Sequence, residues 1–359
     1  MAHIPVQLGP QSYTITIEAG LLADLGARCR DAGLTGRAAV VTNPTVAARY
    51  AATVLDSLAA ADYEPILVEI PDGEAYKTSQ TLNTVYDRLI AGGLDRRCFV
   101  VALGGGVVGD LAGFAAATFL RGIPFVQLPT TLLAQVDSSV GGKTGIDHPA
   151  GKNLIGAFHQ PRLVLADVAT LATLPEREYR AGLAEVVKYG VVLDRQFFEL
   201  LERNAPGLLQ REPSLIIEVV ARCCALKAWV VEQDEQEAGL RAVLNYGHTL
   251  GHAFEALAGY EGLVHGEAVA IGMALAAGIS LGQGLCTRDE HDRIVGLLRA
   301  LGLPTEAPAT GRDRLLAVLT RDKKSRAGVI RYICNQGLGG HLEREFTPAQ
   351  LAETCGAGR

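Results

Sequence analysis

The chain has 359 residues, of which 48% are hydrophobic and 20% are charged. This composition supports a large buried core and excludes the disordered and fibrous classes, and the length favours two domains over one. With 39 acidic and 33 basic residues the formal net charge is -6, which argues against a nucleic-acid partner and favours a small molecule.

Two further features indicate a cytoplasmic protein with no membrane association. Residues 1–20 lack a basic segment followed by an apolar one, and the longest apolar tract, residues 264–281, is interrupted by His265 and Glu267. The seven cysteines include no C-x-x-C pair, and Cys223 and Cys224 adjoin in a helical pattern. We therefore expect reduced core thiols.

The first half of the chain alternates short β-rich runs with helical stretches, which is typical of a mostly parallel α/β sheet. We predict strands at residues 13–17, 38–41, 66–70, 98–103, 125–128 and 163–166. From Pro175 onward the pattern predicts helices over residues 214–234, 248–257, 267–281 and 289–301. We therefore predict an α/β domain over residues 1–174 and a mainly α-helical domain over residues 175–359.

A glycine turn, Gly104 to Gly109, follows the strand predicted at residues 98–103. Its glycines fit the G-x-G-x-x-G spacing, which lets backbone N–H groups and a helix N-terminus approach a pyrophosphate. No acidic residue follows at the spacing of a ribose ligand, so a plain tight turn is an equal alternative. A P-loop is disfavoured at Gly142-Lys143-Thr144, because Asp137 stands where that motif requires glycine.

The stretch from Pro129 to Asp147, followed by Gly151-Lys152-Asn153, combines hydroxyls, glycines and two lysines in what we expect to be a loop. Ammonium groups and backbone amides can bind a phosphate there. A solvated surface loop is an equal alternative.

Three of the eight histidines, His248, His252 and His265, lie close together in the sequence. A helix would stack His248 and His252 on one face, and His265 opens the next helical segment. Thr249 stands where zincin peptidases carry glutamate, so that class is excluded. The cluster favours a metal site over hydrogen-bonded core histidines, and Glu185 is a candidate carboxylate ligand.

Lys227 occupies a helical stripe whose other members are Ile216, Val220, Cys223 and Val230. A buried lysine requires an anionic partner, whereas an ammonium that extends to the surface is the equal alternative. Arg241 and the pair Lys323-Lys324 add cations that could bind an anionic substrate. Taken by itself, the lysine pair is typical of a charged segment exposed to solvent.

Taken together, these segments resemble the 3-dehydroquinate synthase family in order and spacing over nearly the whole chain. The matching segments are residues 72–77, 104–110, 129–147, 152–156, 183–188, 241–252, 265–267 and 322–324. The resemblance implies a Rossmann-like NAD-binding α/β domain, a mainly α-helical metal-binding domain and a homodimer. It implies a shikimate-pathway lyase that converts 3-deoxy-D-arabino-heptulosonate 7-phosphate to 3-dehydroquinate and phosphate. Transient oxidation by NAD, phosphate elimination, reduction and intramolecular aldol closure leave no net redox change.

The same resemblance assigns roles to individual residues. Glu185, His248 and His265 match the ligands of one divalent metal ion, zinc or cobalt, and His252 matches a residue that moves a proton from the substrate hydroxyl. Positions that match NAD contacts are Asp72, Gly73, Glu74, Ala75, Tyr76, Lys77, Gly106, Val107, Val108, Gly109, Asp110, Thr130, Thr131, Lys143, Lys152, Thr170, Leu171, Ala172 and Thr173. Thr170 departs from the family, which often carries an aromatic residue there.

The remaining matches concern the substrate. The phosphate-binding set comprises Lys143, Asn153, Asn245 and Lys323 or Lys324, with Arg121 contributed by a partner subunit. Lys227 and Arg241 match the residues that hold the substrate carboxylate. Asp137 and Lys188 match positions near substrate hydroxyls or the metal.

Three other functions remain open on the sequence. Another sugar-phosphate cyclase, making an inosose, a valiolone or an amino analogue of dehydroquinate, would need a similar site, although Lys227 and Arg241 favour a carboxylate-bearing substrate. A metal-dependent polyol dehydrogenase would consume NAD stoichiometrically and would need fewer cations. A non-catalytic nucleotide-binding module would hold no metal and would tolerate loss of His248.

Overall fold

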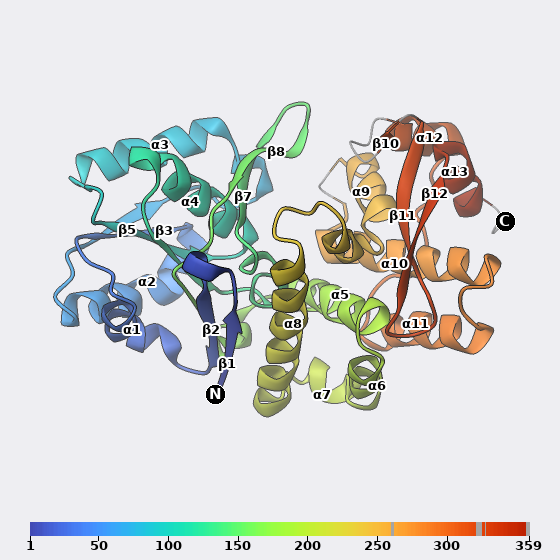
Figure 1. Ribbon diagram of the computed structural model, residues 1–359, viewed down its shortest axis with the longest axis horizontal. Coiled ribbons are helices and arrows are strands. Elements are labelled where there is room, and N and C mark those ends of the chain that lie inside the picture. Colours follow the sequence, from blue (N-terminus) through green and yellow to red (C-terminus); the bar gives the residue numbers. More distant parts are fainter. Residues whose placement is uncertain (260–261, 321–324, 327, 357–359) are drawn as a thin grey trace. The chain divides into compact units, whose positions relative to one another are not determined.

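The computed structural model describes residues 1–259, 262–320, 325–326 and 328–356, and Figure 1 shows the order of their helices and strands. The chain divides into two compact units. The first comprises Met1–Leu174 and Ile216–Gln236, and the second comprises Pro175–Leu215 and Glu237–Arg359. Unlike the division expected from the sequence, this one assigns most of helix α8 (Pro213–Gln233) to the first unit.

The first unit is built on a seven-stranded sheet with the order β1-β2-β9-β6-β5-β3-β4. The strands are β1 (Ala2–Val6), β2 (Tyr13–Glu18), β3 (Ala38–Thr42), β4 (Pro65–Glu69), β5 (Phe99–Gly104), β6 (Phe125–Pro129) and β9 (Leu163–Asp167). All neighbouring pairs are parallel except β1 with β2. The six predicted strands and the mostly parallel sheet are therefore confirmed, whereas β1 was not predicted.

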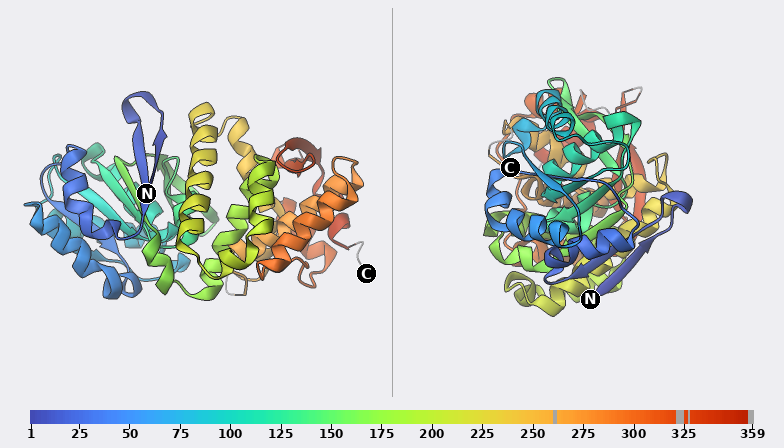
Figure 2. Two further views of the ribbon diagram at one scale, coloured as in Figure 1. Left: turned by 90° about the horizontal axis from the view of Figure 1, so that it is seen from below. Right: turned by 90° about the vertical axis from the view of Figure 1, so that its left-hand side faces the viewer.

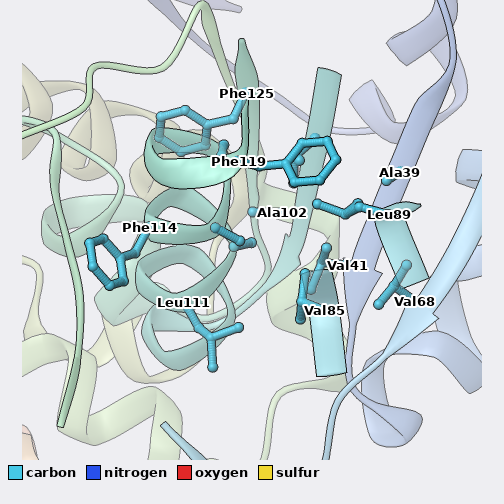
Figure 3. Packing of buried hydrophobic residues seen from close by; sticks show 14 of the residues in the cluster. Ala39, Val41, Val68, Val85, Leu89, Ala102, Leu111, Phe114, Phe119 and Phe125 are labelled. Atoms are coloured by element: carbon cyan, nitrogen blue, oxygen red, sulfur yellow. The ribbon is translucent and has the colours of Figure 1, made fainter. Parts of the chain in front are cut away.

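Helices cover both faces of this sheet, as Figures 1 and 2 show. Because strand side chains alternate, Ala38 and Val40 of β3 pack toward α1 (Leu25–Asp31) and α2 (Pro44–Ala60). Ala39 and Val41 pack toward α3 (Ser79–Ala91) and α4 (Gly106–Thr118), the side drawn in Figure 3. Burial on both faces explains why residues 38–41 of β3 form a continuous apolar run in the sequence.

Residues 129–153, expected to be a loop, contain regular structure. Ala134–Ser138 form a π-helical turn (η5), and β7 (Lys143–His148) pairs with β8 (Gly151–Phe158) as an antiparallel hairpin. The prediction of a loop was wrong because glycine and short polar residues, which have low strand propensity, hide the pattern of the hairpin. The hairpin also excludes a P-loop, since Lys143 begins a strand and not a helix.

The second unit is mainly helical, as predicted. It contains α5 (Glu176–Val192), α6 (Arg195–Arg203), α7 (Ala205–Leu209), α9 (His248–Leu257), α10 (His265–Gly282), α11 (Arg288–Ala300), α12 (Arg312–Thr320) and α13 (Pro348–Gly356). A small antiparallel sheet of β10 (Ser325–Arg326), β11 (Val329–Asn335) and β12 (His341–Phe346) was not predicted. The four helices predicted from periodicity, α8 to α11, are present within two residues of their expected bounds.

Helix α10 is long and apolar enough to cross a membrane by length and composition alone. However, 67% of it is buried inside the protein, as expected for the central helix of a packed core. Its apolar character is therefore accounted for by the fold.

Candidate active site

Three helices of the second unit bring Glu185, His248 and His265 together. Glu185 lies on α5, while His248 and His265 open α9 and α10. The Nε2 atoms of His248 and His265 lie 3.3 Å and 3.5 Å from the same oxygen, Oε1 of Glu185. His252 joins them, since one ring nitrogen from each of the three imidazoles lies within 4.8 Å of the others. The structure thus gathers all four residues that the sequence singled out for a metal site.

A close helix contact places His265 in this cluster. Gly266, the residue after it, packs against α5, and a Cβ at this position would lie 1.9 Å from the backbone oxygen of Ala181. Any larger residue would therefore push α10 away from the helix that carries Glu185.

The hydrogen bonds of the two imidazoles determine which nitrogens face Glu185. Nδ1 of His248 donates to the backbone oxygen of Tyr246 at 3.1 Å, and Nδ1 of His265 donates to Oε2 of Glu255 at 3.2 Å. A carbonyl and a carboxylate only accept hydrogen bonds, so each Nδ1 carries a proton, and in the neutral form of each ring Nε2 is the nitrogen that presents a lone pair. This arrangement is typical of histidines that bind a metal through Nε2.

The electrostatics of the cluster favour a cation. Glu185 is fully buried, and neither of its carboxylate oxygens accepts a hydrogen bond from the described part of the chain, although Lys188 forms an ion pair with it. Burial alone would raise the pKa of Glu185, but Lys188 and His248 hold it well below its usual value. Against the effect of burial, Glu185 and Glu255 raise the pKa of His265 to about 10. Two imidazole nitrogens and one carboxylate oxygen form a donor set that fits zinc or cobalt.

In the first unit, the predicted cofactor positions follow the carboxyl ends of parallel strands. Asp72 follows β4, Gly106 follows β5, Thr130 follows β6, and Thr170 follows β9 in the 3-10 helix η6 (Val168–Thr173). Parallel strands end at the same edge of a sheet, and the chain reverses its order across the sheet between β3 and β5. Open α/β sheets bind ligands in the crevice at such a point.

The strand, glycine turn and helix expected at residues 98–110 are present: β5 ends at Gly104 and α4 begins at Gly106. A Cβ at Gly109 would lie 2.8 Å from Oε1 of Gln127, so glycine allows the helix to pack closely on the sheet. The N-terminus of α4, which presents backbone N–H groups, is therefore suited to a pyrophosphate.

Lys77 lies at the same edge of the sheet and is 3% exposed. Its Nζ atom donates to Oδ2 of Asp110 and to Oδ1 of Asn153, both at 2.6 Å. Nζ of Lys152 lies 3.7 Å from Oε1 of Glu74, and Lys143 is exposed. The structure thus places Lys77 beside the β7–β8 hairpin that carries Lys143, Lys152 and Asn153.

Lys227 is 6% exposed, and its ammonium forms an ion pair with the side chain of Asp137. It also donates to the backbone oxygen of Asp137 at 2.8 Å. The requirement for an anionic partner is therefore met within the first unit, and extension of this lysine to the surface is excluded.

The other predicted residues lie in varied surroundings. Arg241 is 1% exposed in the 3-10 helix η7 (Leu240–Asn245), and Asn245 at its end donates to Oε1 of Glu237 at 2.9 Å. Arg121 follows α4 and so lies at the opposite end of that helix from Gly106. The predicted positions Lys323 and Lys324 lie outside the described residues.

Two second-unit residues that contact the proposed ligands were not singled out from the sequence. Glu255 and the carbonyl of Tyr246 hold the imidazoles of His265 and His248. The sequence could have indicated Glu255, because Glu255 follows His252 by three residues and therefore lies on the same face of the helix. A backbone carbonyl such as that of Tyr246 leaves no signal in side-chain identity.

Comparison with known proteins identifies the family. Residues 67–181 match the N-terminal domain of 3-dehydroquinate synthase and residues 182–325 match its C-terminal domain. A 3-dehydroquinate synthase of Pelobacter propionicus is 61% identical over 356 residues, which is 99% of each chain. The structure of a 2-epi-5-epi-valiolone synthase from Streptomyces hygroscopicus, with NAD+ and Zn2+ bound, is 32% identical over 96% of each chain, with a TM-score of 0.88. A 2-deoxy-scyllo-inosose synthase, solved with carbaglucose-6-phosphate, NAD+ and Co2+, is 26% identical over all of each chain, with a TM-score of 0.91. The chain belongs to the 3-dehydroquinate synthase family.

Proposed function

We propose that the protein converts 3-deoxy-D-arabino-heptulosonate 7-phosphate to 3-dehydroquinate and phosphate, a step of the shikimate pathway that leads to the aromatic amino acids. It uses NAD and one divalent metal ion. The observation that carries the proposal is the convergence of Glu185, His248 and His265 in a chain of this family. Because the cofactor ends as it began, the enzyme is a lyase. We also propose a cytoplasmic homodimer without nucleic-acid or membrane partners.

The metal would be bound by Nε2 of His248, Nε2 of His265 and a carboxylate oxygen of Glu185, with its other positions open to substrate hydroxyls. When bound, it supplies Lewis-acid chemistry that lowers the pKa of a hydroxyl. His252 is exposed on the same face of α9 as His248, so it can accept the proton that the hydroxyl loses. Lys188, which pairs with Glu185, would lie near the same hydroxyl.

NAD would lie along the carboxyl edge of the sheet, where it supplies a reversible hydride acceptor. Its pyrophosphate would meet the N-terminus of α4. The proposed contacts comprise residues 72–77, 106–110 and 170–173, with Thr130, Thr131, Lys143 and Lys152. The hydroxyl of Thr170 donates to the backbone oxygen of Asp167 at 2.7 Å, so this side chain stabilises the turn where the family often has an aromatic residue.

The carboxylate and the phosphate of the substrate would be bound by separate sets of basic and polar side chains. Lys227 and Arg241 would bind the carboxylate, with Asp137 near a hydroxyl. Lys143, Asn153, Asn245 and Lys323 or Lys324, with Arg121 of the partner subunit, would bind the phosphate. In the elimination, an oxygen of the leaving phosphate can itself accept the proton from the carbon beside the newly formed ketone. The phosphate-binding residues therefore need only to position the phosphate.

The direct test is to incubate the purified protein with this substrate, catalytic NAD and zinc or cobalt. Phosphate and 3-dehydroquinate should form together without accumulation of NADH, and a chelator should stop both. Release of phosphate without the carbocycle, or an intact substrate while metal and NAD are bound, would contradict the proposal. The substrates of the inosose and valiolone synthases, and a polyol with stoichiometric NAD, would then be tested.

A further inference from the structure

The tip of the β7–β8 hairpin is fastened to the sheet through Lys77. The backbone N–H of Asp147 donates to the backbone oxygen of Lys77 at 2.7 Å, and Nζ of Lys77 donates to Oδ1 of Asn153 at 2.6 Å. Within the tip, the backbone N–H of Asn153 donates to Oδ1 of Asp147 at 2.7 Å. Of the residues between these anchors, 148–150 are exposed and 151–152 are half-buried. One buried lysine therefore contacts both sides of the tip.

This contact determines the orientation of the Asn153 amide. An ammonium group only donates hydrogen bonds, so the atom that faces Lys77 must be the amide oxygen, and the two N–H donors on Nδ2 turn away from it. Asn153 also adopts a left-handed backbone conformation, with φ at 52°. Asparagine tolerates this conformation better than most residues, so the backbone and the lysine together fix where the amide donors point.

Lys77 is charged, and most of its N–H donors bind other groups of the protein. Burial would lower its pKa, but Asp110 and Glu74 raise it above its usual value, so the ammonium stays charged at neutral pH. Two of its three N–H donors are directed to Asp110 and Asn153 at 2.6 Å. Asp110 lies in the first turns of α4, and its negative charge would repel an anion near that helix N-terminus. Lys77 offsets this charge.

We infer that Lys77 is a positioning residue, which anchors the hairpin tip so that Asn153 presents its amide donors to the substrate phosphate. This role differs from direct contact with NAD, and it rests on the proposed function only for the identity of the anion. Loss of the anchor should weaken substrate binding more than NAD binding.

A lysine-specific endoproteinase tests the anchor without any reaction. The chain has seven lysines, of which Lys77, Lys188 and Lys227 are buried. In the hairpin, Lys143 lies at the base and Lys152 in the tip, and fragment masses distinguish the two cuts. In Lys77→Met, cleavage after Lys152 should become about tenfold faster, the usual effect of losing a hydrogen bond to a charged group. Cleavage after Lys143 should change little and serves as the internal control, and Lys77→Arg should restore much of the protection at Lys152.

Kinetics test the consequence for binding. In Lys77→Met the KM for the phosphorylated substrate should rise about tenfold, with a much smaller change in the KM for NAD. Unchanged cleavage after Lys152, or a rise confined to the KM for NAD, would overturn the inference. If Lys77→Met does not fold, hydrogen exchange at residues 147–152 in Asn153→Gly, which keeps the left-handed backbone without strain, gives the same test, with faster exchange expected than in Asn153→Asp, which keeps an acceptor oxygen for Lys77. Loosening of the tip in a protein that does not turn over the substrate would contradict the proposed function and leave the anchor supported.

Discussion

The carboxylate of Glu255 lies 3.2 Å from Nδ1 of His265, and Glu255 is 4% exposed. Glu255 is on α9, seven residues after His248. The helix that carries one proposed ligand therefore also orients another ligand, which lies on α10.

Replacement of Glu255 by Gln should weaken metal binding by about 10- to 100-fold, because a carboxylate that fixes the tautomer of a ligand is replaced by a neutral amide. Competition between the protein and a chelator measures this affinity directly. Glu343→Gln is the control, since Glu343 is exposed on β12 of the same unit and pairs with the exposed Arg331 at 3.4 Å. Equal affinities in the two variants would show that Glu255 does not orient His265.

Replacement of Gly266 by Ala should lower the free energy of unfolding by about 2 kcal/mol and reduce metal retention, because the new Cβ would collide with a backbone oxygen. Gly278→Ala in the same helix is a matched control, since the nearest atom to its Cβ would be 4.0 Å away. This control should stabilise the helix by up to about 1 kcal/mol. Urea denaturation and metal content of the two variants provide the comparison. Similar losses in both would mean that α10 can shift away from α5 without cost.

Replacement of Lys227 by Met should destabilise the first unit by about 3 kcal/mol, because it leaves the carboxylate of Asp137 beside an apolar side chain. The double variant Lys227→Met with Asp137→Asn should recover more than half of this loss, since it removes the buried charge as well. Chemical denaturation of these two variants and of Asp137→Asn alone gives the coupling energy. Glu218→Gln, an exposed change on the same helix, should stay within about 0.5 kcal/mol of the original protein. Equal stability of the single and double variants would contradict the ion pair.

Alkaline pH should destabilise the protein through its buried thiols. Burial raises the pKa of Cys29 and of Cys224 from 9.0 to about 12. Between these values the folded state binds more protons than the unfolded state, so the free energy of unfolding falls as pH rises from 9 toward 12. Each thiol contributes a slope of about 1.4 kcal/mol per pH unit.

The measurement is urea denaturation of Cys29→Ala and the original protein between pH 7 and pH 10.5. The two curves should run parallel up to pH 8, where the thiol is protonated in both states, and the variant should then lose stability less steeply. Parallel curves over the whole range would mean that the Cys29 thiolate forms as readily in the folded protein as in the unfolded one.

The sequence predicts the sheet well where strands are buried on both faces, because β3 and β5 are then almost entirely apolar and β6 contains a single polar residue, Gln127. It fails for β1, an edge strand that contains Pro5, and for the hairpin, where glycines replace apolar side chains. Helix α8 shows a further limit. Its periodicity predicts the helix itself, but the packing partners of a helix are set by tertiary contacts that no local pattern records.

Part of the candidate metal site could likewise be predicted from the sequence, and part could not. The spacing of His248 and His252 is enough to predict that both lie on one face of a helix, and α9 confirms it. The arrival of Glu185 from α5 depends on a long-range contact through Gly266, which spacing cannot show. Lys227 carried a partial signal, since a cation on an apolar stripe requires a partner, but the sequence could not identify Asp137 as that partner.

The assignment of α8 to the first unit has a consequence for the order of synthesis. Asp137 precedes its partner Lys227 by 90 residues, and part of the second unit, residues 175–215, lies between residue 174 and the return of the chain to the first unit. A growing chain therefore exposes most of the first unit before the helix that completes it has been made. A chain that stops at residue 174 would lack this helix, so the two units cannot be separated by a single cut.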